Sequence, residues 1–254
     1  MLIVISPAKK LDYEESVLTP EITTPELLDH SQELINILKP MNSMDIAELM
    51  DLSSNLSELN FERYQTWKKD VDRNSGKQAL LAFQGDVYTG INAKSFSQQQ
   101  LFDAQRHLRI LSGLYGILKP LDLMRPYRLE MGTKLQNERG KNLYEFWGDI
   151  ITNQLNKDLQ REGSGILINL ASTEYFKSVK QQNIHGNVIT PEFKELKNGE
   201  FKTIGVHAKK ARGLMTKDII IKNITDTNTL KNWKEEGYTF NESISDDKHF
   251  IFTR

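Results

Sequence analysis

The chain has 254 residues, of which 38% are hydrophobic and 26% are charged, a balance that is typical of an ordinary folded protein and excludes a disordered one. It contains no cysteine, which excludes disulfides, thiolate zinc sites, iron–sulfur clusters and a cysteine nucleophile, and which fits a reducing cytoplasm. The formal net charge of −1 conceals an uneven distribution of charge along the chain.

The N-terminal part of the sequence predicts a buried strand followed by helices. Residues 2–6 form a short apolar run with no basic segment before it, which predicts a strand rather than a signal peptide or a membrane span. Thr24, Pro25 and Glu26 are typical of a helix N-terminus, and this helix is expected to run to about Lys39. We also expect helices over 44–50, 56–69 and 97–108, and a strand over 79–83.

The remaining sequence alternates between strand and helix patterns. Apolar residues from Leu143 to Leu159 recur at helical spacing and predict one continuous helix. Strands are expected over 110–114, 166–170 and 201–206, helices over 172–179, 208–222 and 230–236, and edge strands near 238 and 250. We find no repeat or linker, so residues 1–254 are expected to form a single α/β domain, a mixed sheet with surrounding helices and a helical elaboration at about 25–70.

Basic residues concentrate in two segments. Residues 102–141 hold eight basic and four acidic residues, and residues 205–222 hold five basic and one acidic residue, whereas residues 1–60 hold three basic and eleven acidic ones. If the two basic segments converge, they form one positive cleft, which attracts phosphate-rich partners. The alternative is two independent solvated surfaces.

Arg125 and Arg128 bracket a Pro-Tyr turn and predict an anion-binding site. A guanidinium group held on a rigid turn recognises planar anions such as phosphate and carboxylate, because its donors form a fixed fork. The alternative is that these arginines form surface ion pairs with Asp122, Glu130 and Glu138.

Several polar clusters directly follow predicted strands: Ser6–Lys10, Gly85–Asp86, Ser112–Gly116 and Asn169–Ser172. Ligands of open α/β sheets bind beyond the carboxyl ends of the strands, so these clusters are expected to share one crevice. The alternative is that they are ordinary polar turns. Lys209, Lys210 and Arg212 lie along the helix expected over 208–222 and suit contacts with a nucleic-acid backbone, although a merely solvated basic helix has the same pattern.

Motifs for metals and cofactors do not occur. The five histidines match no metal-binding spacing, there is no G-x-S-x-G, and Gly113–Gly116 is not a phosphate-binding loop. We therefore expect no metal site and no cofactor. A direct iron site could use only scattered carboxylates.

Six blocks of the sequence resemble the YaaA family of bacterial peroxide-stress proteins. They occur in that family's order over essentially the whole chain: MLIVISPAKKLDY, AFQGDVYTG, LRILSGLYGILKPLDLMRPYRLEMG, YEFWGDIIT, INLASTEYFKSV and AKKARGLM. The resemblance implies an unusual, non-Rossmann α/β fold and a cytoplasmic protein that limits peroxide damage by keeping unincorporated iron low. It also implies a positively charged cleft, a helix-hairpin-helix-like element and DNA binding.

Carried onto this sequence, the resemblance implies a cleft of ten cationic residues: Lys9, Lys10, Arg109, Arg125, Arg128, Lys177, Lys180, Lys209, Lys210 and Arg212. The hairpin element corresponds to Asp45–Tyr64. That segment carries five carboxylates against Arg63 alone, a charge balance that opposes phosphate binding.

Two functions follow from these residues. The first is a DNA-binding stress protein without catalysis, with little sequence preference and with affinity that falls steeply as salt rises. The second is an enzyme that acts on a nucleotide or modified base in the same crevice, with a nucleotide-like small molecule as its partner. The candidate catalytic residues of the second are Lys9, Asp86, Tyr115 and Glu130. Neither function involves a membrane.

Overall fold

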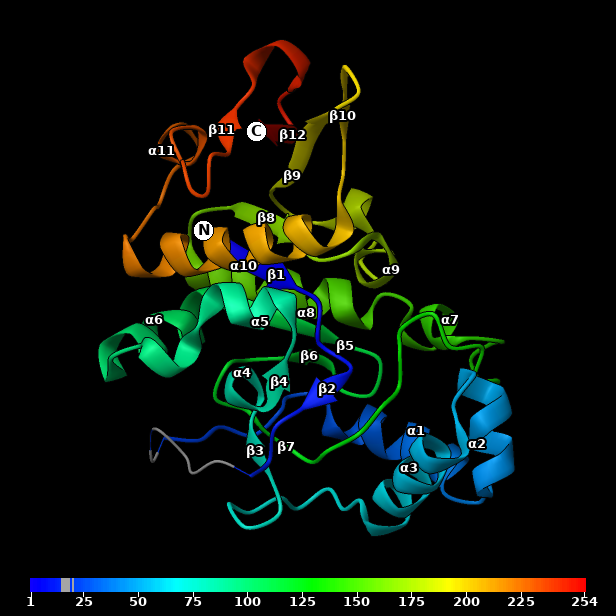
Figure 1. Cartoon of the computed structure of the whole chain (residues 1–254). Coiled ribbons are helices and arrows are strands. Elements are labelled where there is room, and N and C mark those ends of the chain that lie inside the picture. The colour runs from blue at the N-terminus through cyan, green and yellow to red at the C-terminus, as the bar shows by residue number, and fades with distance from the viewer. Residues whose placement is uncertain (15–18, 20) are drawn as a thin grey trace.

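An open, mostly parallel sheet forms the centre of the protein, and the computed structural model describes residues 1–14, 19 and 21–254 (Figure 1). Within these residues the sheet has eight strands. In spatial order they are β11 (Thr239–Phe240), β12 (His249–Thr253), β9 (Asn187–Lys197), β8 (Ile166–Leu170), β1 (Leu2–Ile5), β5 (Leu108–Ser112) and β6 (Gly116–Leu118), with β10 (Glu200–Lys202) paired to β9. The expected mixed α/β fold is confirmed.

Five neighbouring strands of the sheet, from β12 to β5, run parallel, while β11, β10 and β6 pair antiparallel to their neighbours. Numbered along the chain, the parallel strands lie in the order 2-1-3-4-5, whereas a Rossmann sheet has the order 3-2-1-4-5-6. The order reverses between β1 and β8. Open sheets of this kind bind ligands at the carboxyl ends of the two strands that flank such a reversal.

The central strand β1 has the sequence Leu-Ile-Val-Ile, and all four residues are buried. A strand covered by helices on both faces is apolar at every position, which is why the run was readable in the sequence. Two small sheets lie beside the main one. One joins β2 (Lys10–Leu11) to β4 (Phe83–Gln84), and the other joins β3 (Lys77–Gln78) to β7 (Leu123–Met124).

Helices cover both faces of the sheet. They are α1 (Leu28–Leu38), α2 (Ser43–Met50), α3 (Ser54–Thr66), α4 (Ala79–Ala82), α5 (Asp86–Ile91), α6 (Gln98–His107), α7 (Leu143–Trp147), α8 (Ile150–Glu162), α9 (Thr173–Phe176), α10 (Gly205–Ile221) and α11 (Thr227–Lys231), with 3-10 turns at Ala93–Ser95, Gln181–Asn183 and Glu242–Ile244. Figure 1 shows α5, α6 and α10 on one side of the sheet, and α1 to α3 together beyond its β6 edge. The helices expected near 25–70 are therefore present.

Several expected elements differ from the structure. The run over 79–83 is the short helix α4, not a strand, since a short apolar run fits either state. The helix expected over 143–159 is divided into α7 and α8 at Gly148, whose φ of 46° and ψ of −113° interrupt the helical hydrogen bonds. The helix expected from Thr24 starts at Leu28, because the preceding chain bonds to the segment around Leu121 instead.

The strand β9 was not predicted, although its eleven residues make it the longest of the described strands. It alternates apolar and polar side chains and contains Pro191, which weakens any strand pattern. Conversely, the strand expected over 201–206 ends at Lys202, and Val206 belongs to α10. No helix in the described ranges combines the length and apolar character that a membrane crossing needs.

Candidate functional site: a cationic cleft at the end of the parallel strands

A cleft of about 460 Å³ opens at the carboxyl ends of β1 and β8, where the strand order reverses. Its lining comes from five separate segments: Ser6–Lys10, Gln84–Tyr88, Tyr127–Glu130, residues 170–175, and Lys209 with Arg212 of α10. Three of the four polar clusters expected to converge do so. In the fourth, Ser112 and Tyr115 are completely buried and do not line the cleft.

A close crossing of two helices forms one wall of the cleft. At Gly213 of α10, a Cβ atom would lie 2.0 Å from the carbonyl oxygen of Val87. At Gly90 of α5, a Cβ atom would lie 2.5 Å from the carbonyl oxygen of Lys210. Only glycine permits this approach. The crossing therefore brings Asp86, at the start of α5, to the same cleft as the basic side chains of α10.

Glu130 joins two cations on the wall formed by residues 6–10 and 127–130. Its Oε2 atom lies 2.8 Å from Lys9 Nζ, and its Oε1 atom accepts a hydrogen bond of 3.0 Å from Arg128. The Arg128 side chain is mostly buried, and its Nε atom has no hydrogen-bond partner among the described residues. One carboxylate thus faces two cations, and this wall keeps a positive surplus.

Arg212 is a largely buried cation without a close ion pair in the described structure. Within the described part of the chain it forms no ion pair within 4.0 Å, and its buried Nε atom has no hydrogen-bond partner. Burial lowers the pKa of its guanidinium group, and the negative charge of Glu192 raises it less. A buried charge is costly unless an anion compensates it. Arg212 therefore favours an anionic ligand in the cleft.

Tyrosine rings from the same five segments also line the cleft. Tyr88 donates a hydrogen bond of 3.0 Å to the carbonyl oxygen of Ser6, and the hydroxyls of Tyr127 and Ser112 lie 2.6 Å apart. Burial raises the pKa of Tyr88 and Tyr127 well above the ordinary tyrosine value. These phenols are therefore neutral at physiological pH, and the cleft offers uncharged rings beside its cations.

Five of the ten cationic residues expected in the cleft line it, namely Lys9, Lys10, Arg128, Lys209 and Arg212. Three carboxylates, Asp86, Glu130 and Glu174, line it as well, so the cleft has two more cations than carboxylates. Among the described residues, neither Asp86 nor Glu174 forms an ion pair, although Glu174 accepts a hydrogen bond of 3.0 Å from the backbone of Gly132.

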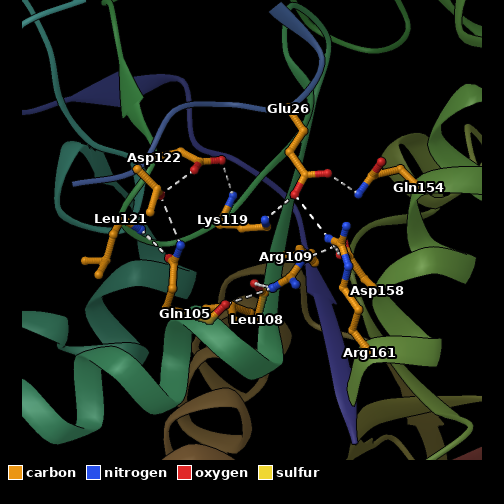
Figure 2. A network of polar contacts seen from close by, with 11 residues as sticks. Glu26, Gln105, Leu108, Arg109, Lys119, Leu121, Asp122, Gln154, Asp158 and Arg161 are labelled. Atoms are coloured by element: carbon orange, nitrogen blue, oxygen red, sulfur yellow. Dashed lines mark hydrogen bonds and ion pairs between the residues drawn. The ribbon is translucent and has the colours of Figure 1, made fainter. Parts of the chain in front are cut away.

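The other five cationic residues lie elsewhere, which corrects their expected placement. Figure 2 shows Arg109 turned toward Asp158 of α8, and the two side chains form an ion pair of 2.7 Å that is almost entirely buried. Arg109 belongs to β5, where its side chain packs under α8 and donates to the carbonyl oxygens of Gln105 and Leu108. It stabilises the interior instead of facing a ligand.

The remaining four cations each have a local partner. Arg125 donates to two backbone carbonyl oxygens, Lys180 pairs with Asp149 at 2.9 Å, Lys210 pairs with Glu236, and Lys177 lies 5.0 Å from the ring centre of Tyr144. These contacts hold the four side chains away from the cleft, although each residue is close in sequence to residues that line it.

Of the candidate catalytic residues, Lys9, Asp86 and Glu130 line the cleft, but Tyr115 does not. Its hydroxyl accepts hydrogen bonds from Trp67 and from the backbone of Arg125, and its side chain is completely buried. The sequence reasoning missed Tyr127, although it lies between Arg125 and Arg128, and also the glycine crossing. The glycines inside the blocks AFQGDVYTG and AKKARGLM were the available signal. In the described residues no group of three or more His, Cys, Asp or Glu is placed to hold a metal ion.

The fold and the cleft define an open α/β protein with a cationic pocket at the reversal point of its parallel sheet. Residues 1–244 match a family model described as peroxide stress protein YaaA. The UPF0246 protein IL2146 of Idiomarina loihiensis is 49% identical over 254 residues, which cover 100% of this chain and 98% of that protein. The chain therefore belongs to the peroxide stress protein YaaA family, as the six blocks predicted. Membership implies a role in the response to oxidative stress.

Proposed function

We propose that this protein is a cytoplasmic DNA-binding protein of the peroxide stress response, and that its DNA-binding surface is the cationic cleft. The observation that carries the proposal is Arg212, a largely buried cation with no ion pair within 4.0 Å in the described structure, in a cleft with four further cations. A backbone phosphate of DNA would supply the missing negative charge. Lys10 and Lys209 are exposed and would contact neighbouring phosphates.

Contacts of this kind bind the DNA backbone and do not read its sequence, so we expect little sequence preference. Each cation that neutralises a phosphate releases condensed counter-ions, and the logarithm of the affinity then falls linearly with the logarithm of the salt concentration. We further propose that DNA binding limits unincorporated iron in the cell. A strain without the gene is expected to show more chelatable iron by electron paramagnetic resonance after peroxide exposure. Wild-type protein should reverse this change, but Arg212→Gln should not.

The direct test is fluorescence anisotropy with labelled single-stranded and double-stranded DNA over a salt series. The variants Lys209→Gln and Arg212→Gln should each weaken binding of all DNA sequences alike and reduce the salt slope by about one. The matched control is Lys180→Gln, which removes the same charge outside the cleft, from a side chain paired with Asp149. Equal effects of the cleft and control variants would refute the cleft as the DNA-binding surface.

A second candidate is an enzyme that acts on a nucleotide or modified base, and the hollow shape of the cleft favours it. A volume of about 460 Å³ lies in the usual range for small-molecule sites. Asp86 and Glu174 line the cleft without a cationic partner among the described residues, and such carboxylates suit general acid–base chemistry. Lys9, Asp86 and Glu130 are the candidate catalytic residues.

Thermal-shift titration with mononucleotides separates the two candidates. The enzyme would be favoured if a nucleotide stabilises the wild type but not Asp86→Asn, and if the wild type binds DNA only weakly. DNA binding without any stabilisation by nucleotides would favour the first proposal.

A further inference from the structure

The loop over residues 125–130 supplies four of the cleft's lining residues, 127–130, yet it contains no helix or strand. Loops at binding sites are positioned by the rigid elements around them. Buried backbone groups of such a loop also need hydrogen-bond partners from outside it. The partners of this loop therefore decide where Arg128 and Tyr127 are held.

Helix α3 and the residues after it provide several of these partners. The Tyr64 hydroxyl donates a hydrogen bond to the carbonyl oxygen of Arg128 itself, and the Tyr64 side chain is completely buried. In the opposite direction, the Arg125 guanidinium donates to the carbonyl oxygens of Lys68 and Asp70 at 3.1 and 3.0 Å. The loop is thus attached at Arg125 and at Arg128 to α3 and the residues that follow it.

Three buried aromatic side chains in successive contact, Trp67, Tyr115 and Tyr127, link α3 to the wall of the cleft. Trp67 donates through Nε1 to the Tyr115 hydroxyl at 3.1 Å, and the backbone N–H of Arg125 donates to the same oxygen at 3.0 Å. The rings of Tyr115 and Tyr127 pack edge to face, with their centres 5.3 Å apart. Tyr127 lines the cleft, so packed side chains connect α3 to the cleft without a gap.

We propose that Tyr64 is a positioning residue for Arg128, and that the α2–α3 hairpin supports the cleft from behind instead of contacting phosphate. This inference rests on the proposed DNA-binding function of the cleft. The Tyr64 hydrogen bond fixes the backbone at Arg128, and that backbone position keeps the guanidinium beside Glu130. The hairpin surface itself suits a supporting role, because the five carboxylates of residues 45–62 are all exposed on it and repel phosphate.

The test is a double-mutant cycle between Tyr64→Phe and Arg128→Gln, measured as DNA affinity by anisotropy over a salt series. Each single variant is expected to weaken binding about tenfold, because each loses the charge-assisted hydrogen bond from Arg128 to a DNA phosphate. Each should also reduce the salt slope by about one. The double variant should bind no more weakly than Arg128→Gln alone, because Tyr64 acts through Arg128. Additive effects would overturn the proposal. Tyr238→Phe is the matched control, since it removes a buried tyrosine hydroxyl bonded to Glu195, outside the cleft lining.

A second readout is independent of DNA. Phenylglyoxal modification of Arg128, followed by peptide mass spectrometry, should be faster in Tyr64→Phe than in the wild type and unchanged in Tyr238→Phe. If the wild type does not bind DNA but Arg128 still becomes more reactive in Tyr64→Phe, the positioning role stands and the DNA-binding proposal fails. If the reactivity of Arg128 is unchanged, the positioning role is wrong. If Tyr64→Phe does not fold, Trp67→Phe removes the second attachment and is expected to expose Arg128 in the same way.

Discussion

The crossing of α5 and α10 gives the sharpest prediction, which is that Gly213→Ala destabilises the protein and opens the cleft. The added Cβ would lie 2.0 Å from the carbonyl oxygen of Val87 and 2.9 Å from Cα of Gly90, whereas ordinary contact begins at 3.4 Å. Both neighbours are backbone atoms, so no side-chain rotation relieves the overlap and the helices must separate.

Overpacking of this kind costs about 1–3 kcal/mol, and the higher helix propensity of alanine returns about 1 kcal/mol. We therefore expect a net loss of up to about 2 kcal/mol in the free energy of unfolding. For a chain of this size each kcal/mol lowers the melting temperature by roughly 2–4 °C. DNA affinity should fall as well, because the separation displaces Arg212 from the cleft wall.

The assay is denaturant unfolding followed by anisotropy on the folded variant. Gly205→Ala is the matched control, since it lies on the same helix and a Cβ there meets nothing within 4 Å. That control should be neutral or slightly stabilising. If Gly213→Ala is as stable as Gly205→Ala and binds DNA like the wild type, then the glycine crossing does not shape the cleft.

Two further predictions concern groups outside the cleft. Arg109→Met should cost about 3–5 kcal/mol in unfolding free energy, because it removes the buried partner of Asp158 and leaves that carboxylate only the exposed Arg161 at 3.6 Å. The folded fraction should bind DNA as before. A loss of DNA affinity at full stability would show that Arg109 does contact DNA. Burial raises the pKa of Glu195, but hydrogen bonds from three side chains outweigh it, so the net pKa is lowered. A lowered folded-state pKa gives stability that is present above the unfolded pKa of about 4.3 and lost as pH falls through the folded value. In urea unfolding, the wild type should therefore be more stable than Glu195→Gln at neutral pH, and this difference in stability should shrink in acid. A difference that stays constant with pH would exclude ionisation of the Glu195 carboxylate as its cause.

Much of the architecture was legible in the sequence because the signals were local. The buried strands β1, β5 and β8 read as apolar runs, and Ser97 and Ser172 cap the helices that follow them by accepting backbone N–H groups. The polar residues at the ends of β1 and β8 also predicted the position of the cleft. By contrast, the break at Gly148 and the strand β9 escaped prediction. The apolar stripe continues on both sides of Gly148, and Pro191 weakens the strand pattern of β9.

The sequence by itself determined the family, the central strands β1, β5 and β8 and the presence of two basic segments. Only the tertiary structure decided which cations share the cleft. Arg109 and Arg212 are equally basic in the sequence, but one is paired with Asp158 inside the protein and the other lines the cleft without a close ion pair in the described structure. The physical reason is that a charge acquires its role from the groups that folding places within a few ångströms of it, and those groups lie 49 residues from Arg109 along the chain.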